Sequence, residues 1–183
     1  MYQRGELLSE GIKNKIKVIA IDPGSRVAGF AVCECSGEYR VSQSDFKVID
    51  VGVVRLNTKK AHTERLYELQ VFVSGLIEKY NPDLFVLEKA FCGVNLSSAL
   101  KLGEVRGALI ALAYSYRIKL VELTPRYVKT ILTGKGAGSK DEVASGLSRL
   151  VGFSKGALPY DASDAVALAL SSGFYCAEHN IKI

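Results

Sequence analysis

The sequence contains no tryptophan, one methionine, two histidines and four cysteines. The cysteines, at positions 33, 35, 92 and 176, form no CxxC pair, and His62 lies far from His179 in the chain. This pattern excludes a zinc site with the usual ligand spacing and a disulfide framework. Thiols without such a framework are typical of a reducing compartment, so we expect a cytoplasmic protein.

Long hydrophobic runs are also missing. The longest uncharged apolar run, Gly107–Tyr116, is too short to cross a bilayer, so we expect no membrane association. Residues 1–14 are polar and lack the apolar segment of a secretory signal. We therefore predict a flexible N-terminal tail at residues 1–14, a folded domain at residues 15–178 and a C-terminal tail at residues 179–183.

The overall composition predicts one globular domain. Hydrophobic residues make up 48% and charged residues 23% of the 183 residues, which is enough to build a core without disulfides. The formal net charge is +5. A basic surplus of this size favours a polyanionic partner, but it is mild and does not establish one alone.

The most informative stretch is an apolar run, Ile16–Ile21, that ends on Asp22 and is followed by Pro23-Gly24. An Ile- and Val-rich run closed by proline and glycine predicts a buried strand. Open α/β sheets place ligands at such strand ends, although an Asp-Pro-Gly turn alone would also explain Asp22. The same pattern recurs in Asp83–Glu88, and this repetition favours a functional role for both carboxylates.

The periodicity along the chain predicts an α/β fold with a mixed five-stranded sheet, three antiparallel strands followed by parallel strands, and helices on both faces. We expect strands at residues 15–22, 27–35, 47–56, 83–88 and 118–122. We expect helices at residues 61–80, 96–116, 140–151 and 160–178, and another that starts at Thr124-Pro125 with an N-cap and a proline in its first turn.

Two glycine-containing stretches need separate interpretations. Gly103 and Gly107 permit a close approach to a neighbouring element, for which the parent sheet is our preferred interpretation and a second subunit the alternative. The stretch Gly134–Lys140 resembles a phosphate-binding loop, but its residue order is wrong and it follows a predicted helix. We therefore interpret it as a mobile linker that carries lysines.

Four acidic residues form the candidate reaction centre. Besides Asp22 and Glu88, the last predicted helix carries Asp161 and Asp164 on one face of its first turn. Capping of the helix dipole would explain Asp161 alone, but not Asp164 beside an otherwise apolar helix. Four converging carboxylates repel one another unless cations lie between them, and a pair of magnesium ions would neutralise that repulsion. Such pairs promote in-line attack on phosphodiesters.

Four motifs, in collinear order, together resemble the RuvC family of Holliday-junction resolvases: IDPGSRVAGFAV, LEKAF, NLSSALKLGEVRGAL and YDASDAVALAL. Each motif is weak alone, but their order and spacing over residues 15–173 make the resemblance specific. The segment before Lys15 departs from the family pattern. The resemblance implies a ribonuclease-H-like fold.

The resemblance also implies roles for individual residues. It makes Asp22, Glu88, Asp161 and Asp164 the catalytic ligands of two magnesium ions, for which manganese can substitute. It places Lys129 and Lys140 at the scissile phosphate as catalytic and DNA-binding residues. It further implies that Phe91 stacks on DNA bases at the junction and that Asn95 contacts DNA.

The implied function is a structure-selective endonuclease that resolves four-way DNA junctions in recombination and repair. A junction with two-fold symmetry implies a homodimer with two active sites. Delivery of the junction by a branch-migration helicase complex stays open.

Three alternative functions differ in what they require of the sequence. A related ribonuclease-H-like nuclease for another branched or hybrid nucleic acid shares the metal chemistry and also stays open. A sugar-kinase or actin-like ATPase requires a second lobe for which this chain is too short. A non-catalytic junction-binding protein would not require all four carboxylates.

Overall fold

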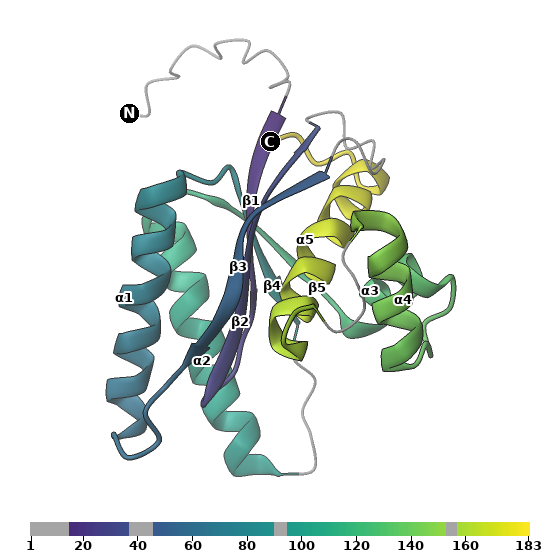
Figure 1. Ribbon diagram of the computed structural model, residues 1–183. Coiled ribbons are helices and arrows are strands. Elements are labelled where there is room, and N and C mark those ends of the chain that lie inside the picture. Colours follow the sequence, from purple (N-terminus) through teal and green to yellow (C-terminus); the bar gives the residue numbers. More distant parts are fainter. Residues whose placement is uncertain (1–14, 37–45, 90–94, 153–156) are drawn as a thin grey trace, which may run out of the picture.

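The computed structural model describes residues 15–36, 46–89, 95–152 and 157–183, and Figure 1 shows their arrangement. A five-stranded sheet has the order β3-β2-β1-β4-β5. The strands are β1 (Lys15–Asp22), β2 (Val27–Ser36), β3 (Phe46–Arg55), β4 (Leu84–Glu88) and β5 (Lys119–Leu123). The helices are α1 (His62–Tyr80), α2 (Leu96–Ser115), α3 (Pro125–Thr133), α4 (Lys140–Val151) and α5 (Tyr160–Glu178).

The sheet is mixed, as the sequence predicts. β1 pairs antiparallel with β2, and β2 pairs antiparallel with β3. β1 also pairs parallel with β4, which pairs parallel with β5. The observed strands begin or end within one residue of the predicted ones. The carboxyl ends of β1, β4 and β5 therefore lie at one edge of the sheet, where a ligand site is expected.

Helices cover both faces of the sheet, which confirms the predicted layers (Figure 1). α1 and α2 pack on one face over a core that includes Phe85, Leu69 and Leu109. α5 covers the other face, with α3 and α4 beside it. Alanine-rich α5 lies close to β1 and β2, because its small side chains permit a short distance between helix and sheet.

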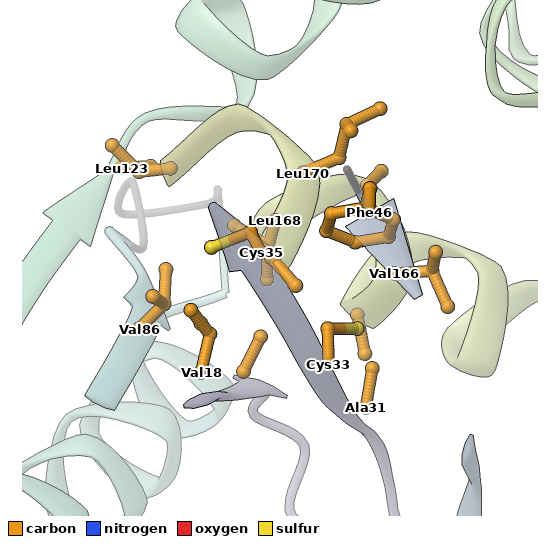
Figure 2. Close-up of a cluster of buried hydrophobic side chains, with 14 of the residues drawn as sticks. Val18, Ala31, Cys33, Cys35, Phe46, Val86, Leu123, Val166, Leu168 and Leu170 are labelled. Carbon is orange, nitrogen blue, oxygen red and sulfur yellow. The ribbon is translucent and has the colours of Figure 1, made fainter. Parts of the chain in front are cut away.

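Figure 2 shows the core beneath α5. Val18 of β1 and Cys33 of β2 lie with Val166 and Leu168 of α5 in one buried cluster. Burial raises the pKa of the Cys33 thiol well above its ordinary value, so this cysteine acts as a small hydrophobic residue. The cluster fixes α5 against the sheet and so determines where the first turn of this helix lies.

The ends of α3 and α4 follow from local sequence. The side chain of Thr124 accepts a hydrogen bond from the backbone N–H of Tyr127 at 3.1 Å, and Pro125 occupies the first turn of α3, as predicted. Gly134 ends α3 with a left-handed φ of 74°, and Ser139 forms a capping box with Glu142 at the start of α4. The segment predicted as a linker thus connects two capped helices.

One preferred interpretation is wrong. Gly103 and Gly107 do not pack against the parent sheet, because a Cβ added at either position has no atom within 4 Å. Both glycines lie on the exposed side of α2.

The C-terminal segment packs on the domain, where partly buried Ile181 and Ile183 contact the core beneath α5. None of the described helices is long and apolar enough to cross a membrane. The predicted N-terminal tail lies outside the described residues, and so does Phe91.

Candidate active site

Asp22 and Glu88 lie side by side at the edge of the sheet. Each is the last residue of its strand, β1 or β4. The two strands are parallel neighbours, and the residues just before the carboxylates, Ile21 and Leu87, are partners in the register. Both carboxylates are only partly exposed. The interpretation of two strand ends as one site is therefore consistent with the sheet geometry.

Gly29 allows the first turn of α5 to approach these strand ends. It pairs with Asp22 across the β1–β2 ladder. A Cβ built on Gly29 would lie 1.9 Å from the backbone carbonyl oxygen of Asp161. No other residue type leaves this space, so the glycine sets the distance between α5 and the sheet. Asp161 and Asp164 thereby come to the same edge as Asp22.

We expect the substitution Gly29→Ala to lower the free energy of unfolding by about 1–3 kcal/mol, because α5 must move away from β2 to make room for the methyl group. The measurement is urea unfolding followed by circular dichroism. The matched control is Gly75→Ala in α1, where an added Cβ meets no atom within 4 Å. This control should raise the free energy of unfolding by about 0.5–1 kcal/mol. Equal stability of Gly29→Ala and the wild-type protein would contradict the assigned contact.

The four acids interact strongly. Burial is the main cause that raises the pKa of Asp22 from 3.8 to about 8. Repulsion from the other carboxylates adds to this rise in pKa, in the order Glu88, Asp164 and Asp161. The side-chain interaction with Glu88 also raises the pKa of Asp22, and it lowers that of Glu88. The cluster thus holds a proton near neutral pH when no cation is bound.

Basic residues face the same cluster. Removal of surrounding water raises the pKa of Glu88, with repulsion from Asp164 second, while Lys129 opposes the rise. The pKa of Asp164 is raised mainly by the same loss of water, although its side chain stays exposed to solvent in part. Lys140 and Lys129 both oppose this rise in the pKa of Asp164. The two predicted lysines therefore lie within electrostatic range of the acids.

A cavity of about 520 Å³ opens between α3, α4 and α5 beside the acids. Glu88, Asp164, Lys129 and Lys140 all line it, together with apolar residues of the three helices. The Lys140 ammonium lies 5.6 Å from the centre of the Tyr160 ring, which immediately precedes Asp161. The structure thus brings two of the acids and both predicted lysines together in one hollow.

Arg106 is a site residue that the sequence analysis missed. Its Nε donates a hydrogen bond to the backbone carbonyl of Glu88 at 3.1 Å. Its guanidinium also pairs with Glu122 of β5. Arg106 therefore ties α2 to the ends of β4 and β5, and its charge opposes the rise in the pKa of Glu88. The available signal was a single arginine followed by a long uncharged stretch, Gly107–Tyr116.

The remaining predicted DNA contacts have different outcomes. Asn95 caps α2, where its side-chain oxygen accepts a hydrogen bond from the backbone N–H of Ser98 at 3.1 Å. This gives Asn95 a structural role, and its contact with DNA stays a prediction. Phe91 lies outside the described residues, so its stacking role also stays a prediction.

The donor chemistry at this site fits hard divalent cations. All four acids offer carboxylate oxygens, which magnesium prefers, and the raised pKa of Asp22 shows that nearby positive charge would be favourable there. Within the described ranges no three acidic, histidine or cysteine side chains form a ready-made cage around one ion. This open arrangement fits cations that are held partly by carboxylates and partly by substrate oxygens and water better than it fits an all-protein cage.

Comparisons with known proteins identify the family of this chain. Residues 18–172 match the family model described as crossover junction endodeoxyribonuclease RuvC. A protein of that description from Pelodictyon phaeoclathratiforme is 40% identical over 153 residues, which cover 84% of this chain and 77% of the relative. Another, from Chlorobium phaeovibrioides, is 38% identical over 159 residues, covering 87% of this chain and 82% of the relative.

Solved structures give the same result. RuvC of Thermus thermophilus in complex with its Holliday junction substrate has a TM-score of 0.81 at 25% identity, covering 91% of this chain and 98% of that one. The yeast mitochondrial Holliday junction resolvase Ydc2, at 17% identity and a TM-score of 0.62 over 93% of this chain and 83% of that one, shares the fold. The predicted ribonuclease-H-like fold is thus confirmed, and this chain belongs to the RuvC family of crossover junction endodeoxyribonucleases.

Proposed function

We propose that this protein is a magnesium-dependent endonuclease that resolves four-way DNA junctions in recombination and repair. The observation that carries the proposal is the convergence of two strand-end carboxylates and two helix carboxylates, with two lysines facing them. Family membership supports the substrate, because relatives are described as crossover junction endodeoxyribonucleases and one is solved with a Holliday junction.

Each group has a distinct task in this proposal. Two magnesium ions, when bound, would activate the attacking water and stabilise charge on the phosphate and the leaving oxygen. Asp22 and Glu88 would hold them from the sheet, and Asp161 and Asp164 from α5. Lys129 and Lys140 line the adjacent cavity, where they would neutralise the phosphate and the charge that develops on it.

The test compares three substrates of equal sequence: a mobile four-way junction, a linear duplex and an RNA–DNA hybrid. With magnesium we expect paired nicks in opposite strands of the junction and little cleavage of the others. Chelation of the metal should abolish cleavage, and manganese should restore it. Preferential cleavage of the hybrid would favour the alternative, a ribonuclease-H-like nuclease with another substrate.

We further propose that the enzyme acts as a homodimer through the outer side of α2. Six exposed residues there form one stripe along the helix, which we term the α2 stripe: Leu96, Leu100, Gly103, Gly107, Ala111 and Tyr114. Leu96, Leu100 and Tyr114 keep 73%, 60% and 65% of their surface exposed. Apolar side chains around two open glycines suit close contact between two copies of a helix. A junction with two-fold symmetry favours two symmetric copies.

Two further assignments complete the proposal. Phe91 would stack on bases that the junction leaves unpaired, which linear duplex does not offer. A branch-migration helicase would deliver the junction in the cell. The described cysteines, Cys33, Cys35 and Cys176, are free, which supports a location in the reducing cytoplasm.

A further inference from the structure

Three exposed cations lie at the carboxyl end of β3 and in the turn after β1: Arg26, Arg55 and Lys59. Some described cations pair with acids, for example Lys60 with Glu68 and Lys15 with Glu34. In contrast, the side chains of these three make no ion pair or hydrogen bond with another described residue. We term them the cationic rim. Unpaired positive charge at a fixed place is what a phosphate backbone binds.

The backbone under the rim is held in place. Arg55 pairs with Val27 in the β2–β3 ladder, and the backbone N–H of Leu56 donates to the carbonyl of Arg26 at 2.9 Å. Asn57 then forms a turn, because its side chain accepts a hydrogen bond from the N–H of Lys59 at 3.0 Å. The rim is therefore a defined part of the sheet edge.

Strand register relates the rim to the reaction centre. Gly29 pairs with Asp22 on one side and with Val53 on the other, so β2 separates Asp22 from β3. Arg55 lies two residues beyond Val53, toward the edge of the sheet that carries Asp22 and Glu88. Two strand spacings and two residue steps give a backbone offset of about 12 Å. Because a nucleic-acid strand rises about 3.4 Å per nucleotide, the offset corresponds to roughly two to four nucleotides.

We propose that the cationic rim binds the phosphate backbone of a DNA arm roughly two to four nucleotides from the scissile phosphate. Lys129 and Lys140 line the cavity beside β4 and α5, whereas the rim lies on the β2–β3 side of Asp22. DNA is then held on both sides of the bond that is cut. This inference rests on the proposed nuclease function and assigns residues to which the family resemblance gives no role.

The test uses the double variant Arg26→Gln/Arg55→Gln, whose side chains are exposed and so should not affect folding. The matched control is Lys47→Gln/Lys119→Gln, which removes the same charge from the starts of β3 and β5, at the opposite edge of the sheet. Affinity for the junction and for linear duplex is measured by fluorescence anisotropy over a range of sodium chloride concentrations, with chelator present to prevent cleavage. Thermal melting checks that both variants are folded.

We expect the rim variant to bind both DNAs about tenfold more weakly, with a salt dependence smaller by about two phosphate contacts, while the control matches wild type. Neutral methylphosphonates in place of the phosphates two to four nucleotides from the cleavage point should weaken DNA binding by the wild-type protein. They should not weaken DNA binding by the rim variant. Equal behaviour of the rim variant and the control would overturn the proposal. If the wild-type protein cleaves no junction, the proposed function is refuted. If its duplex binding still depends on the rim, the rim remains a nucleic-acid-binding surface.

Discussion

The substitution Asp22→Asn should reduce junction cleavage at least about a thousandfold while it makes the metal-free protein more stable. The loss of rate corresponds to about 4 kcal/mol of transition-state stabilisation, which is within the range that metal-ion catalysis supplies. Asparagine keeps the shape of the side chain but removes the charge that a cation requires. Junction binding should change little, because a carboxylate offers the DNA phosphates no positive charge.

The gain in stability follows from the pKa of Asp22, which is about 8 in the folded protein against 3.8 ordinarily. The unfolded chain releases this proton near pH 4, whereas the folded chain keeps it up to about pH 8. The free energy of unfolding of the metal-free wild type must therefore fall as the pH rises through this window. Asparagine carries no such proton, so the variant should be more stable by about 1–4 kcal/mol at pH 7.

Urea unfolding with chelator at pH 5, 6, 7 and 8 measures both effects. Wild type should lose stability with rising pH, and Asp22→Asn should lose less. Magnesium should restore the free energy of unfolding of the wild type at pH 8 and leave that of the variant unchanged, since a cation takes the place of the proton. Asp50→Asn is the control, because this carboxylate is on β3 and interacts with Tyr80 and Lys79 instead of the cluster. A variant that loses both cleavage and stability would indicate a folding role for Asp22.

The substitution Gly107→Gln should weaken dimerisation at least about tenfold, while it leaves the single subunit intact or more stable. An added Cβ at this position meets no atom within 4 Å in one subunit, and glycine costs about 1 kcal/mol in a helix. Across a close helix contact the same side chain obstructs the partner. Sedimentation velocity from nanomolar to micromolar concentration measures the dissociation constant. Cleavage should then change from paired to single nicks.

The matched control for this experiment is Gly75→Gln on α1, at a position where an added Cβ also meets no atom within 4 Å and which lies outside the α2 stripe. It should stabilise the helix without affecting association. If Gly107→Gln stays a dimer at the wild-type affinity, the α2 stripe is not the interface. A dimer lost in both variants would extend the interface across α1.

The strands and their carboxylates could be predicted because the signals are local. An apolar run that ends on Asp22 and a second that ends on Glu88 each show their strand and its last residue within a few positions. Parallel pairing then puts neighbouring strand ends at one edge of the sheet, whatever the details of packing. The helices at residues 62–80 and 160–178 follow from periodicity in the same way.

Other parts of the site depend on contacts between residues far apart in the chain, which local patterns do not contain. Nothing near Gly29 shows that the carbonyl of Asp161 will fill its open face. Arg106 gives the signal of a charged residue before an apolar stretch, but not its hydrogen bond to the Glu88 carbonyl. The position of Gly107 was wrongly interpreted for a related reason, since spacing along a helix does not show which side faces the sheet.

The contact between Gly29 and the first turn of α5 also has a consequence during protein synthesis. Asp22 emerges early from the ribosome, whereas Asp161 and Asp164 belong to the last helix of the domain. A nascent chain, or a fragment from premature termination before this helix, therefore carries at most half of the acidic set. Under the proposed function, catalytic competence would arise only when translation of the domain is complete, and an unfinished product would not cut DNA.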